Sequence, residues 1–299
     1  MASVAETTVA IPPRRKRGPV LHFIGRLFRE KPLGAAGAVV FMLFLFCGIF
    51  ADALAPYGMN QIAPLNRLKP PSWAFPFGTD NLGRDMLSRC LYGAQLSVII
   101  GFCAAGIATV ISVFLGIVSG YLGGKFDLVL QRFVDAWMSF PDLIILIVVV
   151  SVVGPGMPQI IVTLGLLLGI AGSRIIRGAV VSVRENMYVH AAQSTGASTF
   201  RILWRHILPN VMAPVIVLFT TRVGTVILAE SGLSFLGLGV PPPAPTWGGL
   251  LSGSGRTFML QGPWLALAPG LCLTVVVYAT NMFGDALRDL LDPRMRGSR

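Results

Sequence analysis

Imidazole and guanidinium side chains gather in one polar segment of a chain that is otherwise rich in apolar residues. The segment Met187–Pro209 contains His190, Arg201, Arg205 and His206. The two histidines are sixteen residues apart and have no cysteine or carboxylate cluster nearby, so they do not indicate a metal site. The arginines are long side chains that could anchor another protein. The chemistry predicted here is therefore recognition of a partner.

Small side chains fill the part of this segment that precedes the arginines. They are Ala191, Ala192, Gly196 and Ala197. Because they lack bulk, a partner surface could approach the backbone closely, while Arg201, Trp204 and Arg205 follow about two turns further on. Pro209 fits the first turn of the next helix, where its missing N–H costs nothing. The pattern predicts a short docking helix; the alternative is an ordinary polar loop between membrane helices.

Two charged residues lie in the apolar stretch that follows. Arg222 comes eleven residues after Val211, which places it about 16 Å deep, near the middle of a bilayer. A lone arginine there costs roughly 2.5 to 3.5 kcal/mol, so it should face the protein interior or a water-filled path. Glu230 is a candidate partner, although eight residues place the two about 80° apart around a helix. Substrate contact along a translocation path and a structural ion pair both remain open.

The chain lacks the residues that ATP hydrolysis or intramembrane catalysis would require. Lys125 follows Gly124, but Ser119 takes the place of the first glycine of a phosphate-binding loop and Phe126 follows the lysine. Asp142 has no intramembrane aspartate partner, and the histidines lie outside the apolar runs. We therefore expect no enzyme activity, no catalytic residue, and neither a cofactor nor a metal bound by this chain.

The elements that carry these residues are predicted to be membrane helices. Hydrophobic residues make up 54% and charged residues 12% of the 299 residues, against roughly 25% charge in soluble domains. Apolar runs long enough to cross about 30 Å of hydrocarbon predict an all-α, polytopic protein with six transmembrane helices. These runs lie between 31 and 52, 90 and 124, 142 and 154, 158 and 174, 211 and 229, and 264 and 284. Gly154–Pro158 is interpreted as a tight hairpin between the third and fourth.

The positive charge is distributed unevenly along the chain. With six spans and the amino terminus inside, 18 of the 24 Lys and Arg residues fall on the cytoplasmic side, which predicts that both termini are cytoplasmic. The net charge of +11 follows from this topology, and no nucleic-acid partner is expected, since that would require basic and aromatic residues interleaved on one exposed face. The first apolar run is too long and begins too late for a cleavable secretion signal.

The segments between the spans carry further patterns. Leu82, Met86, Leu87, Cys90 and Leu91 recur at helical spacing, which predicts an amphipathic helix lying at the outer surface. The second outer segment, 231–262, contains Pro241–Pro243 and should fold back against the protein or the interface. The four cysteines do not suggest a disulfide framework.

Charged residues also lie near the ends of the predicted helices. Asp127, Arg132 and Asp135 at the third span are interpreted as a structural charge network. A second set forms one stripe at helical spacing beyond the sixth span: Asp285, Arg288, Asp289 and Asp292. Contact with a partner at the cytoplasmic face is preferred for this stripe over a solvated helix end.

Five stretches in order resemble the signatures of dipeptide/oligopeptide/nickel ABC importer permeases, specifically the "C" permease of that system. They are FGTDNLGRDMLSRCLYGAQLSVIIG, GYLGGKFDLVLQRFVDAWMSFPDLI, MYVHAAQSTGASTFRILWRHILPN, SFLGLGVPPPAPTWGGLL and PWLALAPGLCLTVVVYATNMFGDALRDLLDPR. The third is similar to the EAA loop, which receives the push of ATP hydrolysis in those proteins. His190 departs from the acidic first residue of that motif, which puts in doubt the ion pair it would make with the ATPase.

The resemblance implies a type I ABC importer permease fold in a bacterial inner membrane. It implies a basic cytoplasmic tail (1–32), a first membrane helix (33–51), an extracytoplasmic segment (52–95), a core of five helices (96–286) with a coupling loop (178–210), and a cytoplasmic tail (287–299). The implied partners are a homologous "B"-type permease, two ATPase subunits that bind the ATP, and an extracytoplasmic binding protein. The implied cargo is di- or oligopeptides; nickel complexes, opines and glutathione-like compounds are alternatives.

Overall fold

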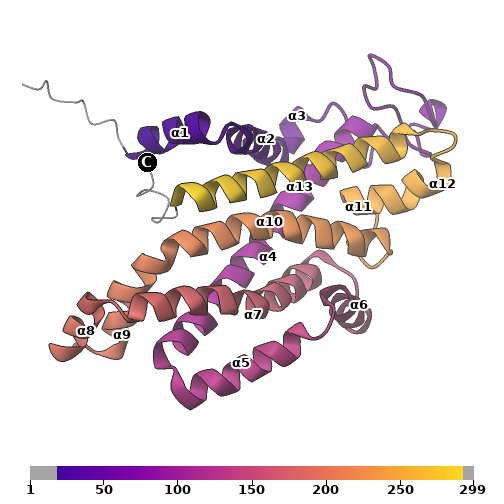
Figure 1. Cartoon of the computed structure of the whole chain (residues 1–299). Coiled ribbons are helices and arrows are strands. Elements are labelled where there is room, and N and C mark those ends of the chain that lie inside the picture. Colours follow the sequence, from indigo (N-terminus) through magenta and orange to yellow (C-terminus); the bar gives the residue numbers. More distant parts are fainter. Residues whose placement is uncertain (1–18, 292–299) are drawn as a thin grey trace, which may run out of the picture.

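Five helices in the described part of the chain are long and apolar enough to cross a membrane. The computed structural model describes residues 19–291, and within that range all the named secondary-structure elements are helices. The candidate spans are α2 (Pro32–Ile49), α4 (Met86–Leu122), α7 (Met157–Arg184), the segment Thr199–Phe235 that ends in α10 (Met212–Phe235), and α13 (Trp264–Leu291). The predicted all-α, multi-span fold is confirmed (Figure 1).

The third predicted span differs from a single straight helix. Two short helices, α5 (Gly124–Met138) and α6 (Asp142–Val153), meet at an angle of 82°, and together they count as the sixth candidate span. The predicted start at Asp142 is the start of α6, but its 12 residues extend only about 18 Å. Pro141 disfavours helical geometry at Phe140, which explains the break. The predicted hairpin is confirmed, since α6 ends before Gly154 (φ +98°) and α7 begins at Met157.

The predicted amphipathic surface helix is wrong, because Leu82 lies in a turn and the other residues of the pattern form the first turns of α4. This helix runs without a break for 37 residues, and Asp85 begins it by accepting a 2.8 Å hydrogen bond from the Ser88 amide. Met86 and Cys90 are buried, and the Trp247 indole donates to the Cys90 carbonyl at 3.0 Å. The periodicity was real, but the second outer segment covers the face that would otherwise meet solvent.

Small residues allow α4 to pack closely with its neighbours. A Cβ at Gly116 would lie 2.7 Å from the Ile176 side chain on α7, and one at Gly165 would lie 2.6 Å from Ile107 on α4. Gly34 on α2 leaves similar room for Ala286 on α13. Close approach through small residues is the usual way to pack helices in lipid. In Figure 1, α4 crosses the directions of α7, α10 and α13.

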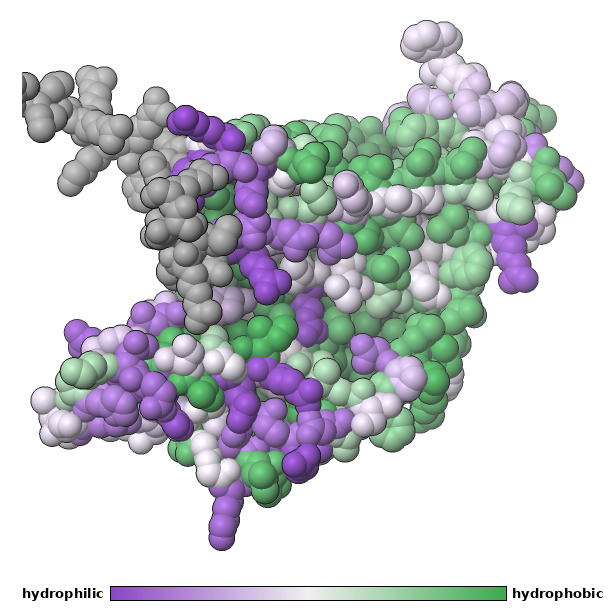
Figure 2. Space-filling view, viewed as in Figure 1, coloured by the Kyte–Doolittle hydropathy of each residue, from purple (hydrophilic) through white to green (hydrophobic). Residues whose placement is uncertain are grey.

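Short helices form the two ends of the molecule. One end holds α3 (Ala51–Leu54), the 3₁₀ turn Pro64–Asn66, α11 (Trp247–Leu250), the π-helical turn Leu251–Gly255 and α12 (Arg256–Phe258). The predicted fold-back of the second outer segment is confirmed, because Trp247 and Leu250 pack in the core. The other end holds α1 (Pro19–Glu30), α8 (Met187–Ser194) and α9 (Thr199–Ile202). Figure 2 shows hydrophilic residues gathered at that second end and hydrophobic residues across the middle of the molecule.

Candidate functional site: the polar arm

The polar segment forms an arm of consecutive short helices at one end of the molecule. After α7, the chain forms α8, α9, a π-helical turn (Leu203–Ile207) and a 3₁₀ turn (Leu208–Val211) that leads directly into α10. We call residues Met187–Val211 the polar arm. The predicted short helix is α8, and Pro209 occupies the first turn of the 3₁₀ segment, as expected. In Figure 1 the arm projects beyond the ends of α7 and α10.

Apolar anchors fix the arm to the helices behind it. Val189, Ile202, Ile207 and Val211 are fully buried or nearly so. They share one core cluster with residues of α4 and α7, namely Ile117, Ile176 and Val180. Burying side chains of this size stabilises the arrangement by about 1.5 to 3 kcal/mol each. The arm is therefore held against the ends of α4 and α7.

Gly196 makes the turn between α8 and α9. Its φ of +76° is in the left-handed region. The Gly196 amide donates to the Gln193 carbonyl at 2.9 Å and the Ala197 amide donates to the Ala192 carbonyl at 3.0 Å. These two bonds are those of a Schellman motif, in which glycine is preferred because it has no Cβ. The Ser198 hydroxyl then accepts from the Arg201 amide and begins α9.

The predicted small residues do not all lie on one outer face. Ala191 and Gly196 are exposed, whereas Ala192 and Ala197 are partly buried and pack against the cluster that anchors the arm. Space around Gly196 is open, since nothing lies within 4 Å of a Cβ placed there. Ala191 and Gly196 are thus the small residues that a partner can reach directly.

The sequence indicated Trp204 as an anchor but not the aromatic and apolar patch that it forms with Phe200. Phe200 is 74% exposed and Trp204 is 66% exposed, and their rings stack with centroids 6.3 Å apart. Met187 is also highly exposed at the start of α8. The spacing of Phe200 and Trp204, four residues apart on a helix, was the available signal. Exposed large aromatic side chains are typical anchors of protein interfaces.

The charge of the arm is entirely positive. Arg201 and Arg205 are exposed, and neither forms an ion pair within residues 23–291. The sequence contains no Asp or Glu from Asn186 to Ala229. The arm therefore presents unneutralised guanidinium groups beside its aromatic patch, an arrangement that suits an acidic groove with an apolar floor.

The two histidines have separate surroundings. The His206 ring lies 6.4 Å from the Tyr188 ring and is half-buried, while His190 is exposed. Among the described residues, no group of three or more His, Cys, Asp or Glu side chains could hold a metal ion. His190 lies beside Ala191 at the reachable surface of α8.

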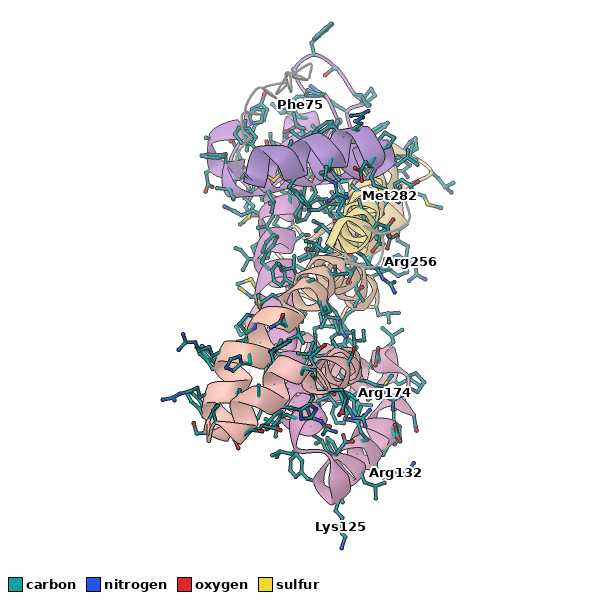
Figure 3. The ribbon with its side chains drawn as sticks, turned by 60° about the vertical axis from the view of Figure 1, so that its left-hand side comes forward. Phe75, Lys125, Arg132, Arg174, Arg256 and Met282 are labelled. Carbon is teal, nitrogen blue, oxygen red and sulfur yellow. The ribbon has the colours of Figure 1, made fainter. Side chains whose placement is uncertain are left out.

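The predicted charge network links α5 to α7 near the arm. Asp127 accepts from the Arg177 Nε at 2.6 Å and from its Nη2 at 2.5 Å, and the Ser119 hydroxyl also donates to it. Asp135 pairs with both Arg132 and Arg174; Figure 3 shows these two arginines at the lower end of the molecule. The Asp127–Arg177 and Asp135–Arg174 pairs join the bent α5–α6 unit to the helix that carries the arm, whereas Arg132 and Asp135 both lie on α5.

The structure does not bring Arg222 and Glu230 together, so the ion pair considered from the sequence is wrong. Glu230 is buried and accepts from the Ser234 hydroxyl at 2.6 Å. The Arg222 guanidinium reaches the notch at Gly172, where an added Cβ would lie 2.7 Å from its Nη2. Its Nη1 is buried without a hydrogen bond, and Asp142 is the carboxylate whose charge acts on it. Arg222 therefore lies against α7, whereas Glu230 is held by hydroxyl groups of its own helix.

Several helices able to cross a membrane, with a fixed polar arm at one end, define a multi-pass membrane protein. Residues 112–297 match the family described as "Binding-protein-dependent transport system inner membrane component", and residues 24–71 match the "N-terminal TM domain of oligopeptide transport permease C". The chain belongs to this family of ABC importer permeases, within the group that carries the permease C amino-terminal domain.

Curated relatives and a solved structure agree with this assignment. The chain is 38% identical to the dipeptide transport system permease protein DppC of Alkalihalophilus pseudofirmus, over 90% of this chain and 88% of the relative. It is 37% identical to the di/tripeptide transport system permease protein DppC of Pseudomonas aeruginosa (89% of each chain) and to the glutathione transport system permease protein GsiD of Escherichia coli (96% and 94%). A structure of the MetNI methionine ABC transporter matches with a TM-score of 0.58 at 17% identity, covering 69% of this chain and 98% of that chain. This last likeness shows the type I permease fold.

Proposed function

We propose that this protein is the C-type permease of an ATP-driven importer and forms part of the path for di- and oligopeptides. The observation that carries the proposal is the polar arm, which offers exposed aromatic rings and free arginines on a base packed against α4 and α7. Relatives named for dipeptide and di/tripeptide transport support peptides as the cargo. A relative named for glutathione, itself a tripeptide, is compatible with that class, and no relative described above favours nickel.

The arm is proposed to dock onto an ABC ATPase through His190, Ala191, Gly196, Arg201 and Arg205. Ala192, Ala197, His206 and Pro209 support that surface from behind or at its edge. ATP would be bound and hydrolysed on two separate ATPase chains, and their closure would move the arm and open the membrane cavity outward. This assignment puts the arm end and both termini in the cytoplasm. The opposite end would receive peptide from an extracytoplasmic binding protein.

A homologous B-type permease is proposed as the second half of the path. Exposed apolar side chains along α13, such as Leu267, Leu271 and Tyr278, supply a surface that lipid or this second permease would cover. Arg222 is proposed to act on the path because the residue is only partly buried and its Nη1 has no hydrogen-bond partner among the described residues. Glu230 is not assigned to the path, since it is buried among hydroxyl groups.

Reconstituted transport tests this function. The permease, its partner permease, the ATPases and the binding protein are placed in vesicles, and accumulation of a labelled dipeptide is measured with ATP supplied to the ATPases. We expect accumulation that needs both ATP and the binding protein. The double substitution Arg201→Gln, Arg205→Gln should weaken ATPase co-purification roughly two- to thirtyfold, since each of the two exposed ion pairs is worth ~0.2 to 1 kcal/mol.

Arg132→Gln is the matched control, because Arg132 is 77% exposed and lies on α5 rather than on the arm. It should leave co-purification and uptake unchanged. Peptide uptake without ATP would reject the importer mechanism, and uptake of nickel but not peptides would change the substrate. Wild-type co-purification in the arm variant would remove the coupling assignment.

A further inference from the structure

A cavity of about 450 Å³ lies between α7, α10 and α13, on the arm side of the molecule. Its walls include Ile175, Val217, Leu218 and Thr221, and its charged residues are Asp285 and Arg288. The site therefore combines an apolar surface with one acid and one base. Figure 2 shows hydrophilic residues near the end of α13, beside hydrophobic ones.

The two charges of the cavity are not neutralised by any of the described residues. Asp285 and Arg288 are three residues apart on α13, a spacing that would allow them to pair, yet neither takes part in an ion pair within residues 23–291. The next acid on the helix behaves differently, because Asp289 pairs with Lys31 at 2.5 Å. Asp292, the last member of the predicted stripe, lies outside the described residues. The stripe thus divides into a paired residue and two free charges that line the cavity.

The position of the cavity along α13 places it near the membrane surface on the arm side. Asp285 follows Trp264 by 21 residues along α13, which is about 32 Å of helix and about the thickness of the hydrocarbon core. Both charges are exposed, so water and a solute reach them from the arm side. The apolar walls continue toward the membrane along α10.

A short peptide with free ends has the matching chemistry. Its ammonium and carboxylate groups are separated by about 7 Å for a dipeptide, and its side chains are suited to an apolar wall. We propose that this cavity is an exit site for zwitterionic short peptides, in which Asp285 holds the amino end and Arg288 holds the carboxylate end before release. The inference rests on the proposed function and identifies a site within it.

Capped peptides test each charge separately. Uptake by the reconstituted complex is compared for a free dipeptide, its N-acetyl form and its C-terminal amide, with the same binding protein throughout. Asp285→Asn should slow uptake of the free dipeptide by about tenfold, the size expected for a lost charged hydrogen bond, while leaving the N-acetyl form at its wild-type rate. Arg288→Gln should show the same selectivity for the amide. Asp289→Asn is the control, because Asp289 faces Lys31, and should not change the ratios.

Direct contact is measured by photo-crosslinking. A dipeptide with a diazirine side chain should label Val217 or Leu218 in the assembled wild-type complex, and Asp285→Asn should reduce that labelling. Equal loss of free and capped peptide uptake together with loss of ATPase co-purification would overturn the proposal and make the stripe an ATPase contact. Wild-type uptake of all peptides by both variants would reject the exit site alone, whereas failure of the wild-type complex to transport peptides would reject the proposed function.

Discussion

Gly196 has a conformational role that its small size alone does not reveal. The residue closes α8 in the left-handed region, with two hydrogen bonds of a Schellman motif. A Cβ placed there would meet no atom within 4 Å, so a substitution acts through backbone strain or through the partner surface. These two effects can be separated by choosing residues that differ in their tolerance of positive φ.

We predict that Gly196→Ala weakens the turn by about 1 kcal/mol, whereas Gly196→Asn weakens it less, because asparagine visits the left-handed region more readily. ATPase co-purification should fall more for alanine than for the larger asparagine. The measurement is the amount of ATPase retained by each purified permease. A loss that follows side-chain volume instead would show that steric contact at Gly196, and not the geometry of the turn, limits docking.

Arg222 and Glu230 are predicted to act independently. In a double-mutant cycle of Arg222→Gln and Glu230→Gln, the changes in thermal stability should add within about 0.5 kcal/mol, because the two side chains do not interact. The cycle is measured by thermal unfolding of the purified protein. A coupling energy well above that value would restore the ion pair that the structure separates.

Reasoning from the sequence identified the arm but not which of its small residues are exposed and which are partly buried. The small residues were visible as a group, yet the anchoring cluster that turns Ala192 and Ala197 inward comes from α4 and α7, more than ten residues away in the chain. The same limit applies to Arg222, whose surroundings are set by Gly172 and by Asp142 on other helices. Periodicity reports on one helix, and these positions depend on contacts between helices.

At the scale of elements, α5 is tied to α7 by carboxylate–guanidinium pairs. The Asp127 side chain is only 14% exposed and forms a two-point contact with Arg177. A contact through two hydrogen bonds fixes the relative orientation of the two groups more firmly than a single surface ion pair does. The bent α5–α6 unit is therefore positioned by the helix that also carries the arm.

We predict that Asp127→Asn destabilises the protein by about 1 to 3 kcal/mol, because it leaves Arg177 without its partly buried counter-ion. Arg132→Gln, which removes an exposed ion pair, should cost no more than ~1 kcal/mol. Unfolding temperatures of the two purified variants test the difference. Equal small effects would show that the Asp127–Arg177 contact contributes little to the packing of α5.

The elements themselves could be predicted in large part from apolar runs and helix breakers. Gly154 and Pro209 gave correct boundaries because their backbone chemistry is local. The first turns of α4 were misassigned because a helix covered by Trp247 has the same periodicity as one covered by lipid headgroups. The bend at Pro141 could not be predicted in the same way, because a hydropathy pattern contains no information on the angle between α5 and α6.

At the scale of the molecule, the arm and the outer segment lie at opposite ends (Figure 1), which makes the orientation testable. In a background without native cysteines, Ala74→Cys should react with a membrane-impermeant thiol reagent added outside intact cells, whereas Ser198→Cys should react only after permeabilisation. Both positions are exposed. External labelling of Ser198→Cys would invert the orientation.

Cys90 supplies an internal control for that experiment. Its thiol lies near the outer end of α4 but is buried beneath the second outer segment. With Cys90 as the only cysteine, labelling should be absent until the protein is unfolded. Rapid labelling of the folded protein would mean that the Trp247 cover opens readily.

The length of α4 has a mechanical consequence. Its 37 residues make a rod of about 55 Å, longer than the hydrocarbon layer, and the helix has no proline. Near one end the rod carries the carbonyl that receives the Trp247 indole, and near the other Ile117 packs on the arm's anchors. A displacement imposed on the arm is therefore delivered to the opposite face of the membrane as a tilt or translation of one stiff body, with no intermediate joint to absorb it.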